Sequence, residues 1–336
     1  MKKIGVLGAG SWGTALSVVL HKNGHKITIW SALAPEIEML KEKHEQAEKL
    51  PGVILPDDIM FTTDLKEAIE GKDMLVLAVP SPFTRSTAKA MSPFVAEGQL
   101  IVSVAKGIEE NTLMTLSEII MEEIPQCEVA VLCGPSHAEE VGKEIPTSLV
   151  AGAKKRATAE LVQNTFMSEV LRVYTSPDVL GMEIGASLKN VIALAAGMAD
   201  GLGYGDNTKA ALITRGISEM GRLALAMGAK YETLSGLTGM GDLIVTCASK
   251  HSRNRRAGYL MGQGYTMQQA MDEVKMVVEG VYSAKAAIAL AKKYHVDMPI
   301  IEQVNEVLFE DKPAKDAVKE LMLRDKKVEH DDLEWQ

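Results

Sequence analysis

The spacing of hydrophobic residues changes character about halfway along the chain. In the first half, short runs rich in β-branched residues alternate with helical stretches. Seven such runs predict strands, at residues 4–7, 26–30, 74–79, 100–104, 128–132, 148–151 and 171–174. Alternation of this kind is typical of a parallel sheet with helices on both faces. We therefore expect an N-terminal Rossmann-like domain with a doubly wound, mostly parallel sheet.

From about residue 177 only helical patterns remain. They predict helices at residues 178–200, 207–227, 266–273, 279–294 and 299–308. The expected fold class is thus α/β, with a dinucleotide-binding domain over residues 1–178 and an all-helical substrate-binding domain over residues 179–328. Residues 329–336 read as a charged tail. Residues 34–64 predict only a charged helix and a loop.

Length and composition narrow the classes of function. The chain has 336 residues, enough for two hydrophobic cores, and a formal net charge of −9, which argues against a general nucleic-acid binder. Its three cysteines lack metal-ligand spacing and cannot all pair, so we expect a reduced, cytoplasmic chain without a metal site. Glycines interrupt the first apolar stretch at once, and no membrane span is expected elsewhere.

A glycine-rich turn follows the first predicted strand directly. Gly8, Gly10 and Gly13 form a GxGxxG pattern with Ser11 and Trp12 between them, and a helix is expected over residues 14–22. Glycines at these positions permit a tight turn and close approach to a pyrophosphate, whose charge meets the amides of the helix start. The strand, turn and helix together predict binding of NAD(P)H.

The second strand ends without a charged residue. An acid normally stands there to bind the ribose of NAD, but this chain has Ser31 and Ala32, and no Arg or Lys to hold a 2'-phosphate. The pattern leaves the choice between NAD and NADP open, and we expect NADP or dual use.

Lys189 lies in a helical stretch of apolar and small residues. Its neighbours on the same face are Gly185, Ala186, Ile192 and Ala193, none of which can pair with an ammonium. Such a lysine either reaches out to water or is held inside for chemistry. Partial burial would lower its pKa and make it a usable proton donor and acceptor.

Four further segments offer polar groups. Residues 104–109 and 133–140 follow strands, where ligands bind in such sheets, and residues 236–243 lie in the helical half. Ser252 precedes a short helical stretch at residues 257–261 and is a candidate N-cap. The free amides of Arg253 and Asn254, with a guanidinium, would then form a phosphate seat, although a solvated basic turn remains the alternative.

The chain resembles the NAD(P)-dependent glycerol-3-phosphate dehydrogenases of the bacterial type. The resemblance runs in order over nearly the whole chain. It rests on GAGSWGTALS, LPG, AVPS, AKGIE, GPSHAEEV, SLKNVIALAAGMADGLGYGDNTKAALITRG, GLTGMGDLIVTC and SRNRRAG. It implies reversible hydride transfer between a nicotinamide and dihydroxyacetone phosphate or sn-glycerol 3-phosphate, usually toward the glycerol phosphate that begins phospholipid synthesis. By analogy, the helical domain would pack as a homodimer.

The resemblance also implies roles for individual residues. Lys189 would be the acid/base, Asp242 and Thr246 would orient it, and Asn190 would assist. Lys106 would face both nicotinamide and substrate. The implied substrate-binding residues are Lys106, Gly134, Ser136, Lys189, Asp242, Ser252, Arg253 and Asn254. The implied cofactor-binding residues are Gly8, Gly10, Ser11, Trp12, Gly13, Ser31, Lys106, Ala138, Arg253, Val277 and Glu279.

The chain departs from the family pattern in two places, and both concern the adenosine end of the cofactor. Many relatives have Arg, His or Lys just after the second-strand Trp, where this chain has Ser31 and Ala32. The position before the LPG motif, often aromatic, is Lys49. One hypothesis is that Lys49 compensates by binding a 2'-phosphate.

Two other functions fit part of the pattern. A related two-domain NADP-dependent reductase would act on a ketoacid or a hydroxyacyl thioester, and the Ser252–Asn254 turn argues against it because it suits a compact phosphate. A protein that only senses or scaffolds NAD(P) would not need Lys189 and Asp242 in its substrate crevice.

Overall fold

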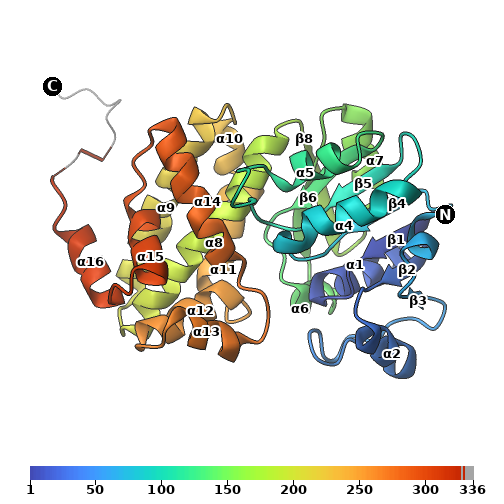
Figure 1. Ribbon diagram of the computed structural model, residues 1–336, viewed down its shortest axis with the longest axis horizontal. Helices are drawn as coiled ribbons and strands as arrows, with labels where there is room; N and C mark the ends of the chain where they lie inside the picture. Colours follow the sequence, from blue (N-terminus) through green and yellow to red (C-terminus); the bar gives the residue numbers. More distant parts are fainter. Residues whose placement is uncertain (327, 330–336) are drawn as a thin grey trace.

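The protein consists of a sheet domain and a helical domain, lying side by side in the computed structural model (Figure 1), which describes residues 1–326, 328 and 329. The predicted tail over residues 329–336 lies outside the described residues except for Glu329. The chain passes from the sheet domain to the helical domain between Ser176 and Val179.

Eight strands form one sheet in the order β3-β2-β1-β4-β5-β6-β7-β8. They are β1 (Lys3–Leu7), β2 (Lys26–Trp30), β3 (Met60–Thr62), β4 (Met74–Leu77), β5 (Leu100–Ser103), β6 (Glu128–Cys133), β7 (Thr147–Gly152) and β8 (Leu171–Ser176). The seven predicted strands are confirmed. The sequence pattern missed β3, an edge strand of 3 residues that is too short to show the periodicity of a strand.

The last two strands run against the rest. β6 pairs antiparallel with β7, and β7 pairs parallel with β8. The connection from β6 to β7 contains only one helical turn, whereas a parallel neighbour needs a crossover helix to return the chain to the starting edge. The sheet is therefore mostly parallel, as expected.

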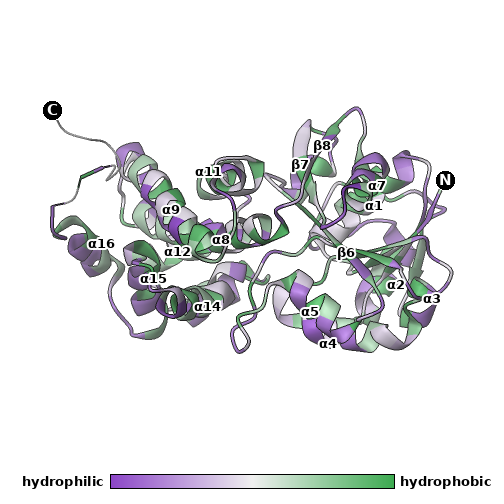
Figure 2. Ribbon diagram, turned by 90° about the horizontal axis from the view of Figure 1, so that it is seen from above, coloured by the Kyte–Doolittle hydropathy of each residue, from purple (hydrophilic) through white to green (hydrophobic). Residues whose placement is uncertain are grey.

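Helices cover both faces of this sheet. The helices and 3₁₀ turns of this domain are α1 (Ser11–Lys22), α2 (Ala34–Lys43), α3 (Leu65–Ile69), η1 (Ser81–Phe83), α4 (Thr84–Met91), η2 (Ser92–Phe94), α5 (Leu116–Glu123), α6 (Ala138–Val141) and α7 (Arg156–Phe166). Figure 2 shows α1 and α7 on one side of the sheet and α4 and α5 on the other. The central strands β4 and β5 are accordingly buried on both faces and read as continuous apolar runs.

The helical domain is built around one long apolar helix, α8. Its elements are α8 (Val179–Gly201), α9 (Asp206–Ala226), α10 (Tyr231–Leu234), the π-helical turn η3 (Leu237–Gly241), α11 (Asp242–Ala248), α12 (Arg253–Gly262), α13 (Met267–Val274), α14 (Glu279–Tyr294), α15 (Pro299–Phe309) and α16 (Ala314–Met322). All five predicted helices are present within one residue at each end. α16 was not predicted.

α8 is buried along nearly all of its length because α9, α11, α12 and α14 pack around it. Small residues allow the closest of these contacts. A Cβ added at Gly197 would lie 2.0 Å from the Arg255 carbonyl oxygen, and one added at Gly258 would lie 2.1 Å from that of Leu194. Backbone therefore packs on backbone, and the start of α12 is held at a fixed place beside the middle of α8.

Candidate active site

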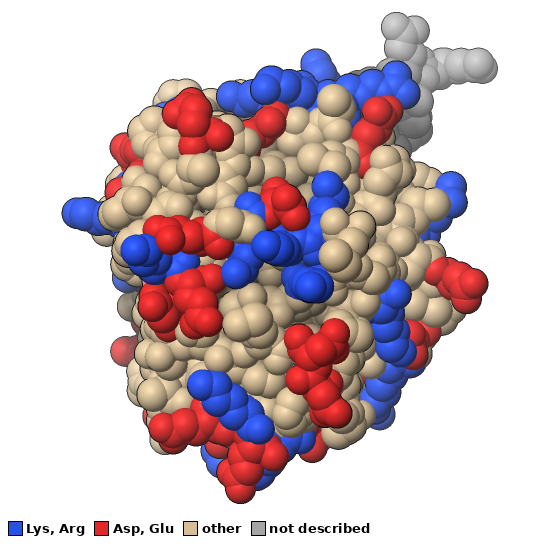
Figure 3. Space-filling model, turned by 90° about the vertical axis from the view of Figure 1, so that its right-hand side faces the viewer, with Lys and Arg blue, Asp and Glu red and all other residues tan. Residues whose placement is uncertain are grey.

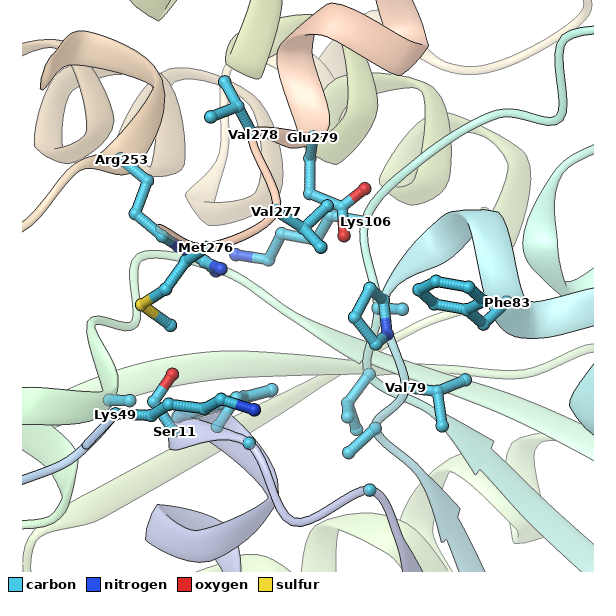
Figure 4. A pocket seen from close by; sticks show the side chains of 18 of the residues that line it. Ser11, Lys49, Val79, Phe83, Lys106, Arg253, Met276, Val277, Val278 and Glu279 are labelled. Carbon is cyan, nitrogen blue, oxygen red and sulfur yellow. The ribbon is translucent and has the colours of Figure 1, made fainter. Parts of the chain in front are cut away.

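A cleft of about 1000 Å³ separates the two domains and is lined from both. Figure 4 shows Arg253 and Met276 of the helical domain facing Ser11 and Lys49 of the sheet domain, and Lys106 beside Val277 and Glu279. The predicted site residues that line the cleft are Gly8, Gly10, Ser11, Trp12, Ser31, Lys106, Ser136, Ala138, Lys189, Asn190, Asp242, Thr246, Ser252, Arg253, Asn254, Val277 and Glu279. Gly13 and Gly134 lie behind its wall.

The glycine-rich turn has the geometry that a dinucleotide requires. Gly8 has a φ of +126°, which side chains rarely adopt, and a Cβ there would lie 2.7 Å from the Ala78 backbone. A Cβ on Gly13 would lie 2.0 Å from the Gly8 carbonyl oxygen, whereas one on Gly10 would meet only open space. α1 begins at Ser11, three residues earlier than predicted, so the amides of Ser11 and Trp12 belong to its unpaired first turn. These features fit a pyrophosphate.

At the end of β2, the structure places a carboxylate that the sequence pattern did not predict. Glu36, in the first turn of α2, accepts a hydrogen bond from Ser31 Oγ at 2.6 Å and forms an ion pair with Lys49 Nζ. All three residues line the cleft. The sequence did signal this carboxylate through the charged helix predicted after Ser31. Because that helix starts just after Ser31, its first turn brings Glu36 back to the end of β2.

Lys189 is buried in the cleft wall on α8, as the sequence suggested. Its Nζ donates to Asp242 Oδ1 and to Thr246 Oγ1, both at 2.7 Å, and these partners come from α11. Burial lowers the pKa of Lys189 to about 8, against the attraction of Asp242. The ammonium is thus held in a fixed direction with a proton that it can give up near neutral pH.

Asp242 joins two lysines from different domains. Its Oδ2 accepts from Lys106 Nζ at 2.7 Å, while Oδ1 accepts from Lys189. Burial favours the neutral acid, but the two ammonium groups outweigh it and hold the pKa of Asp242 below its ordinary value. Lys106 also donates to the Gly134 carbonyl at 2.9 Å, as does Ser136 Oγ at 3.0 Å. Gly134 therefore supports the site through its backbone.

The start of α12 supplies a second polar cluster. Ser252 caps this helix as predicted, its Oγ accepting from the Arg255 amide at 3.2 Å, and the helix begins at Arg253 rather than near residue 257. The Asn254 side chain donates to Asn190 Oδ1 at 2.9 Å and accepts from the Gly280 amide at 2.8 Å. Its side chain is thus committed to linking α8, α12 and α14, and its backbone amide belongs to the first turn of α12.

Two further residues, His137 in the cleft wall and Ser81 bonded to the cleft residue Glu279, were given no role from the sequence. Ser81, at the start of η1, donates its amide to Glu279 Oε1 at 3.1 Å and its hydroxyl to Oε2, which joins the domains. Burial raises the pKa of Glu279 despite these bonds. Burial and the nearby lysines lower the pKa of His137 to about 4, so its ring is neutral near pH 7. Ser81 ends the AVPS motif and His137 lies within GPSHAEEV, so these two motifs could have pointed to both residues.

Comparison with known proteins identifies the family of this chain. The N-terminal family model of NAD-dependent glycerol-3-phosphate dehydrogenase matches residues 3–159, and the C-terminal model matches residues 178–319. The chain belongs to this family. A glycerol-3-phosphate dehydrogenase [NAD(P)+] of Agathobacter rectalis is 72% identical over 335 residues, with 100% of both chains covered. One from Fusobacterium nucleatum is 60% identical, covering 98% of this chain and 99% of that one.

Solved structures agree with the sequence matches. The glycerol-3-phosphate dehydrogenase of Coxiella burnetii has a TM-score of 0.93 at 36% identity, covering 96% of this chain and 99% of that chain. A ketopantoate reductase from Ralstonia eutropha shares the fold alone, with a TM-score of 0.61 at 17% identity. The chain is thus an NAD(P)-dependent oxidoreductase of the glycerol-3-phosphate dehydrogenase family, and the alternative reductase is not favoured.

The described residues also bear on metal binding and on membrane insertion. No group of three or more His, Cys, Asp or Glu side chains in this part of the chain could hold a metal ion. Within the same residues, only α8 is long and apolar enough to cross a bilayer, and 89% of its most apolar window is buried inside the protein. That burial is typical of a core helix.

Proposed function

We propose that the cleft reduces dihydroxyacetone phosphate to sn-glycerol 3-phosphate, reversibly, with NAD(P)H. The observation that supports this most strongly is the Lys189–Asp242–Lys106 set beside the glycine-rich turn. A hydride transfer needs no side-chain nucleophile and no metal, only positioning and a proton source, because the nicotinamide supplies the hydride when bound. This cleft offers both.

Lys189 is the proposed proton donor to the substrate oxygen. A ketone that becomes an alcohol gains one proton at oxygen, and a buried ammonium with a lowered pKa can deliver it. Asp242 and Thr246 would fix the direction of its N–H bonds, while Asn190 assists from the next position on α8. Lys106 would stabilise charge on the same oxygen from the sheet domain.

The start of α12 is the proposed seat of the substrate phosphate. Free amides at a helix N-terminus attract an anion, and the Arg253 side chain adds a positive charge that lines the cleft. Ser252 and the Asn254 amide belong to the same turn, and Ser136 lines the cleft from the sheet domain. A phosphate here would place the reacting carbon toward Lys189 on the neighbouring helix.

The sheet domain, residues 1–178, would hold the cofactor. Gly8, Gly10, Ser11 and Trp12 would receive the pyrophosphate, Gly13 would let α1 pack closely on Gly8, and Ser31 would meet the adenosine ribose. Lys106, Ala138, Arg253, Val277 and Glu279 would enclose the nicotinamide half. Residues 179–328 would bind the substrate.

Initial rates with a panel of ketones test this assignment. Oxidation of NADH and of NADPH is followed by the absorbance of the reduced nicotinamide, with dihydroxyacetone phosphate compared against ketoacids. We expect turnover of the phosphorylated ketone alone. Faster turnover of a carboxylated ketone would contradict the phosphate seat, and cofactor binding without turnover of any ketone would favour a sensor.

The setting of the enzyme is also a proposal. Product glycerol phosphate suits phospholipid synthesis, and three free cysteines suit the reducing cytoplasm. On the face in Figure 3, acidic and basic side chains are interspersed, which supports the absence of nucleic-acid binding through this face. A homodimer formed by the helical domains stays a prediction, which sedimentation equilibrium can check.

A further inference from the structure

We propose that the ion pair between Glu36 and Lys49 determines how this chain chooses between NAD and NADP. The inference rests on the cofactor placement proposed above, and it concerns only the adenosine end of the cleft. Figure 4 shows the Lys49 side chain extending into the pocket beside Ser11 of the glycine-rich turn. The 2'-position of the adenosine ribose is where NADP differs from NAD.

The contacts make Ser31, Glu36 and Lys49 one unit. Ser31 Oγ donates to Glu36 Oε2 at 2.6 Å and accepts from the Leu33 amide at 3.1 Å, which fixes the carboxylate at the end of β2. Glu36 Oε1 accepts a hydrogen bond from the Lys49 ammonium. The side chain of Glu36 is 11% exposed and that of Lys49 is 30% exposed, so the ammonium is the more open of the two charges.

The two charges favour different cofactors. A carboxylate accepts hydrogen bonds from ribose hydroxyls and repels a 2'-phosphate, whereas an ammonium binds that phosphate. Each group has capacity left after the pairing, because a carboxylate offers about four lone-pair sites and an ammonium three donors. The pair sums to zero charge, so neither cofactor is rejected. The balance between these two charges therefore sets the preference for NAD or NADP.

Removing one charge at a time should move the preference in opposite directions. Glu36→Gln keeps an acceptor for Ser31 but frees the charge of Lys49, so binding of a 2'-phosphate should strengthen. Lys49→Met leaves an unpaired carboxylate, so binding of the same phosphate should weaken. A hydrogen bond to a charged group is strong enough to change the affinity by about tenfold or more, which corresponds to about 1.4 kcal/mol or more.

Calorimetric titration with cofactor fragments measures this without turnover. Adenosine 2',5'-bisphosphate and 5'-AMP differ only in the 2'-phosphate, and the ratio of their dissociation constants isolates its contribution. We expect that ratio to shift about tenfold toward the bisphosphate in Glu36→Gln and about tenfold away from it in Lys49→Met. Glu38→Gln and Lys43→Met, on the exposed side of α2, are the matched controls and should leave the ratio unchanged.

The outcomes separate this inference from the proposed function. If the unmodified enzyme binds both fragments and both dinucleotides, but neither variant changes the ratio, the pair does not select the cofactor and only the inference fails. If the unmodified enzyme binds neither fragment, the cofactor placement itself is wrong. Glu36→Gln preserves side-chain shape and hydrogen bonding, so it tests the inference even if Lys49→Met unfolds.

Discussion

At the scale of single residues, the site depends on how Asp242 distributes its charge. One buried carboxylate accepts from Lys189 and from Lys106, each at 2.7 Å. Three charged groups thus share a small space with one excess positive charge, at the place where the substrate oxygen would gain negative charge during reduction. Stabilising charge that develops only during the reaction is the arrangement that accelerates chemistry.

Replacing Lys189 by alanine should remove the proton donor and leave cofactor binding intact. A positioned acid contributes about 10²- to 10⁴-fold in rate, so kcat should fall by that order. Quenching of Trp fluorescence by NADH, expected because Trp12 and Trp30 line the cleft, should give an unchanged Kd. Near-normal turnover would contradict the assignment of the acid.

The pH dependence of reduction should follow the ionisation of Lys189. The donor must be protonated, and burial lowers its pKa to about 8. We therefore expect kcat/KM for dihydroxyacetone phosphate to be high below pH 8 and to fall as pH rises through that value. For oxidation of glycerol phosphate the free amine is needed, so the rate should rise over the same interval. Parallel profiles in both directions would exclude Lys189 as the titrating group.

At the scale of elements, the contact of α8 with α12 connects the buried lysine to the phosphate seat. Gly197 and Gly258 let the two helices approach until backbone meets backbone. Asn190 and Asn254 then bond across the contact. The distance between the proposed proton donor and the proposed phosphate site is therefore set by helix packing rather than by a loop.

Gly258→Ala should disturb this packing. The new methyl group would lie 2.1 Å from the Leu194 carbonyl oxygen, so α12 must shift, at a cost of about 1–3 kcal/mol in the free energy of unfolding. We expect a lower Tm and a higher KM for the phosphorylated ketone. Gly221→Ala is the matched control, because its Cβ finds only Tyr231 at 3.8 Å, and it should be neutral or slightly stabilising. Equal effects in both variants would contradict the packing argument.

The elements also show how far sequence reasoning extends. The strands from β4 to β6 and the helix α8 were predictable because a continuous apolar run must be buried, and few structures can bury it. The start of α1 was placed late because Gly10 serves as N-cap without a side chain that would signal it. The partner of Ser31 was missed because Glu36 comes near β2 only through the turn between them, and side-chain pairing across such a turn leaves no periodicity.

At the scale of the whole molecule, groups on both domains form the site, and bonds across the cleft join them. Lys106 reaches Asp242, and Ser81 is bound by Glu279. Both links lie where the nicotinamide half of the cofactor is proposed to bind. A ligand in this cleft would contact both domains at once.

Cofactor should therefore stabilise the entire chain in one step. Binding to the folded state alone raises the free energy of unfolding by about 2.7 kcal/mol when ligand is present at 100 times its Kd. We expect differential scanning calorimetry to show a single transition that moves to higher temperature with NADPH. Movement of only one of two separate transitions would mean that the ligand contacts a single domain.

The bond between Lys106 and Asp242 has one more consequence, because it makes the acid strength of Lys189 depend on both domains. Burial lowers the pKa of Lys189 most, and the positive charge of Lys106, which comes from the sheet domain, lowers it further. If the two domains moved apart, Lys189 would lose that repulsion and keep the attraction of Asp242, so it would become a weaker acid. A contact between domains thus tunes a proton donor that belongs to only one of them.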